Sequence, residues 1–485
     1  MAEADAQSRS RIDRFFKIQE RGSTVGREVR GGFVTFFAMA YIIVLNPLII
    51  GTVPDATGNF LGGGQEPNLA MIAAATALVA GVITILMGLI ANFPLALAAG
   101  LGLNAFVAFA IATQMTWADA MGLVVIEGVL MLILVLTGFR KAIFEAVPRE
   151  LKTGISVGIG LFIAFIGLIN GGFVSATGLP SPPVELGIGG SLTGWPVLVF
   201  SVGLLVMIVL YTRRIRGAIL WAIIGTAIVA VIVEEIAQIG IRTDENPTGW
   251  TLNAPAIPDQ VAGLPDFGLL GEFSLLGSWE RVGVVTVLLF VFTLLLTDFF
   301  DTMGTMVAVG AEGDLLDKDG NPPATQRILV ADSLGTLAGG AGSVSTNTSY
   351  IESSAGVGDG ARTGLASVIT GVCFLLATFL SPVVALIPNE AAAPALVLVG
   401  FLMMSQIRSV SWDRLEIAIP VFLTVVLMPF TFSISVGIGA GFVSHVIIKA
   451  ARGQARAIHP LLWIVAAAFL IYFAIDPIEG LLGVS

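Results

Sequence analysis

Three acidic side chains lie inside stretches of sequence that are otherwise apolar. Asp298 and Asp301 fall in TVLLFVFTLLLTDFFDTMGTMVAV, and Glu352 falls in VSTNTSYIESSAG. A carboxylate at the centre of a bilayer is costly unless it is paired, protonated or facing water, so such residues are usually functional. Asp298 and Asp301 are one helical turn apart and lie on about the same face. We predict that these acids bind a polar ligand or a proton, although one could instead cap a broken helix.

Glu352 allows two interpretations. At the start of a half-helix its carboxylate could be satisfied by the free backbone amides. Alternatively, the carboxylate could accept two hydrogen bonds from a flat heterocycle, and the extended run SVSTNTS in front of it favours this second role. Asn104 in GLGLNAF and Asn46 in YIIVLNPLI hold matching places in the first half. An amide offers both a donor and an acceptor to a base-like ligand, but Asn46 precedes Pro47 and could equally end a helix.

Aromatic rings accompany these polar residues. Phe299 and Phe300 lie between the two aspartates, and Phe106 follows Asn104 by two positions. Each ring could stack on a planar ligand or simply pack against neighbouring helices. The fourth apolar segment adds Glu127, which lies deep in the segment, and Asp119 near its start, where solvent is expected to reach it.

The composition is that of a protein with many membrane-spanning helices. Of the 485 residues 56% are hydrophobic and only 12% are charged, and the mean hydropathy is +0.93. Apolar runs of about 17–25 residues, the length that spans a bilayer as a helix, recur along the chain. The net charge of −10 argues against nucleic acid as a partner. Cys373 is the single cysteine, and no cluster of Cys and His suggests a metal or a cofactor.

Hydropathy divides the chain into two series of seven segments around a polar loop at 241–282. The first series lies near 31–50, 69–91, 97–112, 117–138, 153–175, 194–212 and 217–238. The second series lies near 283–309, 327–341, 346–357, 363–387, 392–409, 416–432 and 434–449, with an extra apolar segment at 459–477. That last segment could span the membrane or lie in its interface.

The distribution of basic residues predicts the orientation, because Lys and Arg favour cytoplasmic loops. Basic residues gather before the first segment, after the fourth and after the sixth, at Arg9–Arg30, Arg140–Lys152 and Arg213–Arg216. The loops at 51–68 and 171–193 contain neither Lys nor Arg. These positions place the N-terminus in the cytoplasm and the central loop outside. With seven segments per half, the second half must then be inverted. We read 416–449 as a hairpin turning near 429–433, with one long helix as the alternative.

Two segments, each the third of its half, are interrupted. PLALAAGLGLNAFVAFAIA and GGAGSVSTNTSYIESSAG both join an extended Gly- or Ser-rich piece to a helical piece. Backbone outside a helix is tolerated at membrane depth only where it is packed in protein or lines a cavity. Inverted repeats with broken helices at the midplane are typical of secondary transporters. The sequence therefore predicts a transporter whose ligand site lies between 97–112 and 346–357.

The motifs GGFVTFFAMAYIIVLNP, GLGLNAF, TDFFDTMGT and STNTSYIESSAGVGDGARTGL resemble those of the AzgA-type purine permeases of the nucleobase:cation symporter 2 group, in the same order and over nearly the whole chain. The resemblance implies an all-α polytopic membrane protein with fourteen transmembrane segments, two inverted seven-helix repeats, and short strands with half-helices in segments 3 and 10. The implied divisions are a cytoplasmic segment (1–30), a core domain (31–138 and 283–390), a gate domain (139–240 and 391–450), an extracellular loop (241–282) and a C-terminal part (451–485).

The resemblance also implies a function and roles for single residues. The activity would be uptake of adenine, guanine and hypoxanthine, coupled to protons or alternatively to sodium, with the core sliding against the gate as an elevator. Predicted substrate-binding residues are Glu352, Asp298, Asn104, Ser349 and Phe299. Predicted residues for proton coupling or site structure are Asp301, Asp298, Glu352 and Asn46. The protein would be a multi-pass protein of the cell membrane, and faces of small residues make a homodimer plausible.

Two alternatives stay open at this stage. A carrier of the same architecture could transport uracil, xanthine or an anion, although three acids facing the pocket argue against an anion. An intramembrane aspartyl enzyme would need two acids on facing elements that share a proton. Asp298 and Asp301 lie one turn apart on one predicted helix, so the sequence favours transport over catalysis.

Overall fold

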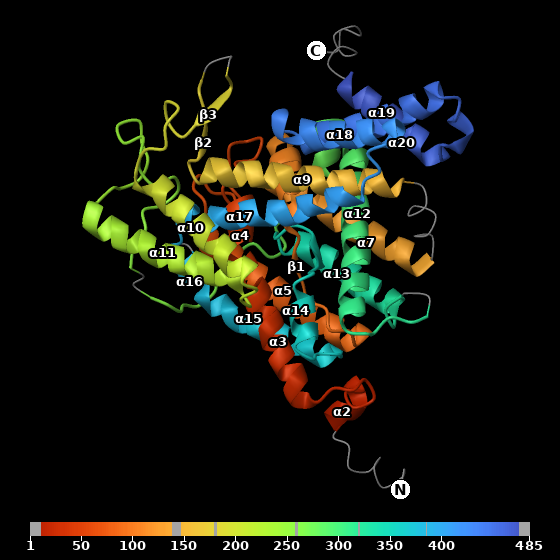
Figure 1. Ribbon diagram of the computed structural model, residues 1–485, viewed down its shortest axis with the longest axis horizontal. Helices are drawn as coiled ribbons and strands as arrows, with labels where there is room; N and C mark the ends of the chain where they lie inside the picture. The colour runs from red at the N-terminus through yellow and green to blue at the C-terminus, as the bar shows by residue number, and fades with distance from the viewer. Residues whose placement is uncertain are drawn as a thin grey trace.

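The computed structural model describes residues 11–137, 147–178, 182–257, 260–318, 321–384 and 386–474, and helices dominate them (Figure 1). The helices before the central loop are α2 (Arg11–Phe16), α3 (Val25–Met39), α4 (Ile42–Ile50), α5 (Leu69–Ala91), α6 (Leu101–Phe106), α7 (Trp117–Thr137), α9 (Arg149–Asn170), α10 (Trp195–Thr212) and α11 (Ala218–Ala237). Those after it are α12 (Gly277–Glu312), α13 (Thr325–Ala341), α14 (Ser353–Gly358), α15 (Gly364–Ala377), α16 (Ser381–Val384), α17 (Asn389–Met404), α18 (Leu415–Phe430), α19 (Ile434–Ala451) and α20 (Pro460–Phe473).

Many of these helices are suited to a bilayer. Within the described residues, 10 helices are long and apolar enough to cross a membrane, which agrees with the polytopic all-α fold expected from hydropathy. The arrangement as fourteen spans in an inverted repeat stays a prediction. The predicted domain boundary between 138 and 139, the basic residues Arg140 and Lys141, and the end of the predicted segment 459–477 lie outside the described residues.

Two short strands meet in the interior of the molecule, where β1 is labelled in Figure 1. Strand β1 (Leu97–Ala99) pairs with β4 (Asn347–Ser349) in antiparallel register, with Ala98 opposite Thr348. Every residue of both strands is buried. The second strand pair, β2 (Val174–Ala176) with β3 (Val184–Leu186), forms a hairpin at the periphery.

The buried strand pair is possible because neighbouring groups satisfy its backbone. Buried N–H and C=O groups need partners, and a strand edge exposes both. The ladder continues through Gly100 N to Thr346 O and Tyr350 N to Ala96 O, each 2.9 Å. At the outer edge of β1, the Thr84 hydroxyl donates to Leu97 O (2.9 Å) and accepts from Leu97 N (3.0 Å). A single side chain of α5 thereby closes one edge of the strand.

Small residues bring two pairs of helices into close contact. A Cβ added to Gly88 of α5 would lie 2.4 Å from Gly364 O at the start of α15, and one added to Gly371 would lie 2.5 Å from Gly81 O. Helices α9 and α17 approach in the same way, since a Cβ on Gly400 would lie 2.4 Å from Gly160 O. In a bilayer such small-residue faces let helices pack through their backbones. These contacts pack α5 closely against α15 and α9 closely against α17.

The interrupted tenth segment differs in detail from the prediction. Strand β4 begins at Asn347 rather than at Ser343, because Ser343 and Ser345 have φ values of 53° and 70° and turn the chain. Helix α14 begins at Ser353. Glu352 is therefore its N-cap residue, whereas a position in the first turn of the half-helix was expected. The hairpin in 416–449 is present, with α18 ending at Phe430 and α19 beginning at Ile434.

Candidate functional site

Glu352 lies where the chain leaves β4 and enters α14. Its side chain makes no capping hydrogen bond to the amides of α14, so the interpretation as a simple helix cap is wrong. Instead the Tyr41 hydroxyl, from the break between α3 and α4, donates to Glu352 Oε1. Glu352 is only half-buried, whereas Tyr41 is 1% exposed. The carboxyl group is therefore held by Tyr41, in a residue that is only partly buried.

Asp301 is the acid of α12 that interacts with Glu352. It is exposed, although Asp298 one turn earlier is fully buried. The Asp301 carboxyl interacts electrostatically with Glu352. On the adjoining part of α12, Lys152 Nζ of α9 lies 3.6 Å from the centroid of the Phe300 ring, a cation–π contact. The two accessible acids thus lie beside a contact between α9 and α12.

Three other carboxyl groups form a buried cluster behind β4. Glu127 of α7, Asp298 of α12 and Asp332 of α13 are each 0% exposed and interact electrostatically with one another. Each receives hydroxyl hydrogen bonds on one oxygen, from Thr346 to Glu127 (2.8 Å), from Thr336 to Asp298 (2.7 Å), and from Thr302 and Ser349 to Asp332 (2.7 and 3.0 Å). Their second oxygens, Glu127 Oε1, Asp298 Oδ1 and Asp332 Oδ2, accept no hydrogen bond from the described residues.

The three acids of this cluster lack a compensating positive charge in the described part of the chain. Among the described residues, none of the three acids forms an ion pair with a basic side chain. Burying three uncompensated charges side by side would be strongly unfavourable, so they cannot all be ionised together. Because their hydroxyl donors include Thr346 and Ser349, the cluster also fixes the position of β4.

Asn104 and Asn46 form a second buried polar chain. Asn104 Nδ2 donates to Asn46 Oδ1 (2.6 Å). Asn46 Nδ2 in turn donates to Thr76 Oγ1 (2.8 Å) and to Val344 O (3.2 Å). Asn104 Oδ1 has no hydrogen-bond partner in the described part of the chain. This chain joins the first, second and third predicted segments to Val344, which lies just before the tenth.

The aromatic candidates mostly pack against other rings. Phe299 is 6% exposed and meets Phe300 edge to face at 5.5 Å between centroids. Phe106 is 2% exposed and meets Phe290 edge to face at 6.0 Å. These contacts account for both rings as packing residues.

The structure therefore separates the predicted site residues into two groups. Glu352 and Asp301 are less buried and interact with each other, whereas Asp298, Asn104, Asn46 and Ser349 are buried in hydrogen-bond networks. Asp332 and Tyr41 were missed. Asp332 lies in the apolar run RILVADSLGTLAGGA, where the rule that flags intramembrane acids would have found it. Tyr41 carries no comparable signal in the sequence.

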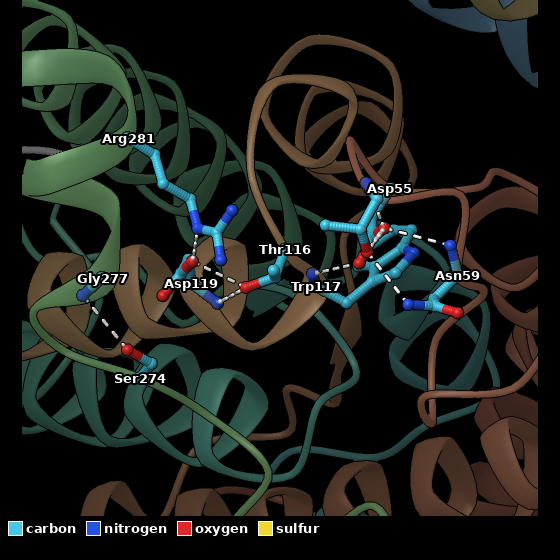
Figure 2. Close-up of polar contacts among 9 residues, drawn as sticks. Asp55, Asn59, Thr116, Trp117, Asp119, Ser274, Gly277 and Arg281 are labelled. Carbon is cyan, nitrogen blue, oxygen red and sulfur yellow. Dashed lines mark hydrogen bonds and ion pairs between the residues drawn. The ribbon is translucent and has the colours of Figure 1, made fainter.

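The helices that carry two of the buried acids are tied together at one end. Figure 2 shows Asp119, at the start of α7, accepting hydrogen bonds from Thr116 Oγ1 (2.6 Å) and from Arg281 Nε of α12 (2.9 Å). Asp119 is thus buried in an ion pair rather than solvated as expected. In the same view Asp55 Oδ2 accepts from Trp117 N (3.2 Å), the first amide of α7. These contacts fix α7 and α12, and with them Glu127 and Asp298.

Hydrogen bonds favour the ionised form of Asp55. It belongs to the loop 51–68, outside the membrane-spanning helices. Burial alone would raise the pKa of Asp55, but hydrogen bonds from Thr57, Asn59 and Trp117 stabilise the carboxylate and lower its pKa below the usual value. Hydrogen bonds to the charged form always act in this direction.

Comparison with known proteins identifies the family. Residues 26–440 match the model of a permease family. The chain belongs to this family. The permease is 37% identical to the guanine/hypoxanthine permease PbuG of Bacillus subtilis, with 95% of this chain and 98% of that one covered. It is 36% identical to the adenine permease AdeP of Escherichia coli, with 95% of each chain covered. These relatives confirm the expected resemblance to purine permeases.

A solved structure supports the fold. The permease superposes on the transmembrane domain of the cyanobacterial bicarbonate transporter BicA with a TM-score of 0.60, at 15% identity, covering 86% of this chain and 97% of that one. At this identity the likeness concerns the fold alone. Since the family and these relatives are membrane permeases, the protein is a transporter, and the alternative of an intramembrane aspartyl enzyme is set aside.

Proposed function

We propose that the permease takes up the purine nucleobases adenine, guanine and hypoxanthine together with protons. The observation that carries this proposal is the similarity, over nearly the full length of the chain, to permeases named for guanine and hypoxanthine and for adenine. The site agrees with it in chemistry. Guanine and hypoxanthine present N–H donors, and an accessible carboxylate such as Glu352 accepts them well.

In this proposal the two groups of polar residues have different tasks. Glu352 binds the purine, and Asp301 lines the same space. Asn104 and Ser349 hold the region of the strand pair in position through buried hydrogen bonds, and Phe299 packs beside them. The proton is carried by the buried cluster around Asp298, because its acids lack basic partners and are bonded to the strand that leads to Glu352. Release of a proton from the cluster would then change the hydrogen bonds of β4, and with them the position of Glu352.

Transport itself would follow an elevator scheme. The core (31–138 and 283–390) carries the strand pair and the acids, and it would slide against the gate (139–240 and 391–450). We propose that the N-terminus is cytoplasmic, that the protein resides in the cell membrane, and that two copies associate through small-residue faces.

The test is uptake by purified permease in liposomes. Radiolabelled adenine, guanine and hypoxanthine should each accumulate under an inward proton gradient, and a protonophore should abolish accumulation. Uptake of none of the three would refute the purine proposal, and accumulation driven by sodium alone would refute proton coupling. Unlabelled uracil, xanthine and sulfate serve as competitors, since the alternative carriers predict that one of them blocks uptake.

A further inference from the structure

Tyr41 occupies an unusual position in the first membrane segment. It lies in the two-residue break between α3 and α4, where Ala40 and Tyr41 interrupt the helix. Its side chain is 1% exposed, and its hydroxyl donates to Glu352 Oε1, 311 positions further along the chain. A buried tyrosine hydroxyl needs a partner, and here that partner is the accessible acid of the proposed binding site.

No other side chain in the described residues donates a hydrogen bond to Glu352. The titratable groups that act on this carboxyl electrostatically are Asp301 of α12, Tyr211 of α10 and Tyr350 beside it. Tyr350 uses its hydroxyl elsewhere, donating to Ala99 O of β1 (2.5 Å). The orientation of the Glu352 carboxyl group therefore depends on Tyr41.

We propose that Tyr41 positions Glu352 and thereby sets the preference of the permease among purines. The proposal rests on the proposed purine transport. A carboxylate has about four acceptor sites on its two oxygens, and Tyr41 occupies one of them on Oε1. The second oxygen and the remaining lone pair stay available for a ligand edge. A hydroxyl donor to the carboxylate also stabilises its charge.

Charge on Glu352 matters differently to different purines. Guanine presents two adjacent donors, N1–H and its 2-amino group, so it pairs with an ionised carboxylate that only accepts. Adenine presents an acceptor at N1 beside its amino donor, so it needs a protonated acid that both donates and accepts. Hypoxanthine has N1–H beside the acceptor O6 and distinguishes less between the two forms of the acid. By stabilising the carboxylate, Tyr41 favours guanine over adenine.

The experiment compares Tyr41→Phe with a matched tyrosine variant of the purified permease. Dissociation constants for guanine and adenine are measured across a pH series. Tyr41→Phe should weaken guanine binding roughly ten-fold or more, as expected for a lost hydrogen bond to a charged group. Adenine binding should be retained, so the ratio of the two constants changes by about the same factor. The pH above which guanine binds tightly should move upward.

A control variant separates positioning from loss of structure. Tyr472→Phe removes a hydroxyl from α20, where the Tyr472 ring contacts Phe473. This variant should leave the ratio unchanged. Equal weakening of both purines by Tyr41→Phe, or an unchanged ratio, would overturn the positioning role. Failure of the unaltered permease to bind either purine would instead overturn the proposed function.

Discussion

Glu352 is only partly buried, and its role in binding can be tested apart from its effect on folding. Its side chain makes no capping hydrogen bond to α14 and receives one side-chain hydrogen bond in the described structure. Glu352→Gln should lower guanine affinity by about ten- to a hundred-fold, because the amide places a donor opposite one of the two adjacent N–H donors of guanine. Binding assays and thermal unfolding measure the two effects separately. Glu280→Gln, at an exposed position of α12, is the control, and normal binding by Glu352→Gln would remove Glu352 from the site.

The buried cluster makes a prediction about energy coupling rather than affinity. Asp298→Asn keeps an acceptor for the Thr336 hydroxyl but cannot gain or lose a proton. We expect purine binding within about three-fold of the unaltered permease and a loss of accumulation driven by a proton gradient, measured in liposomes. Asp332→Asn, which retains acceptors for Thr302 and Ser349, should behave alike. If both variants still accumulate substrate against a gradient, the coupled proton is not held in this cluster.

Among the elements, the start of α7 depends on a carboxylate from a distant loop. Asp55→Asn keeps only one acceptor oxygen, so the Trp117 amide or the Thr57 and Asn59 donors lose a partner. The cost should be about 1–2 kcal/mol, as for a lost helix cap. Because the pKa of Asp55 is lowered in the folded protein, its stabilisation is fully present above its unfolded pKa, about 4, and disappears as the pH falls further.

Thermal unfolding at several pH values measures this effect. At neutral pH Asp55→Asn should unfold at a lower temperature than the unaltered permease. This difference in unfolding temperature should shrink as the pH falls below about 4. The exposed Asp266, which accepts from Gly268 N (2.9 Å) in its own loop, provides the control variant Asp266→Asn. A stability difference that stays constant across the acid range would contradict the proposed charge on Asp55.

How far the sequence could predict these elements depends on the range of the contacts. The breaks near Gly100 and Asn347 were predictable, because local runs of Gly, Ser and Thr interrupt apolar segments. The acids of α12 and α14 were predictable from their apolar surroundings. The pairing of Tyr41 with Glu352 was not, because a single sequence carries no information about contacts between distant segments. For the same reason the sequence did not show that Asp298 has Thr336, Glu127 and Asp332 as neighbours, and its contact with substrate stays a prediction.

At the scale of the whole molecule, one cluster joins the proposed core to the proposed gate. Asp359, which follows α14, forms ion pairs with Arg30 of α3 and with Arg216 from the loop between α10 and α11. The pair with Arg216 measures 2.6 Å. Beside it, Gly217 has a φ of +70°, and a Cβ there would lie 2.8 Å from Phe37 O. Helix α14 thus runs from its N-cap residue Glu352 to its C-cap residue Asp359 at this junction between the proposed domains.

If the core slides against the gate, the Arg216–Asp359 contact must open in each transport cycle. We expect a short thiol cross-linker between Arg216→Cys and Asp359→Cys, in a Cys373→Ser background, to block uptake, and its cleavage to restore it. Each single cysteine variant is the control. Arg216→Gln should instead change the uptake rate by less than about five-fold, because Arg216 is largely exposed and such pairs contribute about 0.2–1 kcal/mol. Cross-linked permease that transports at the full rate would contradict relative motion of the two domains at this contact.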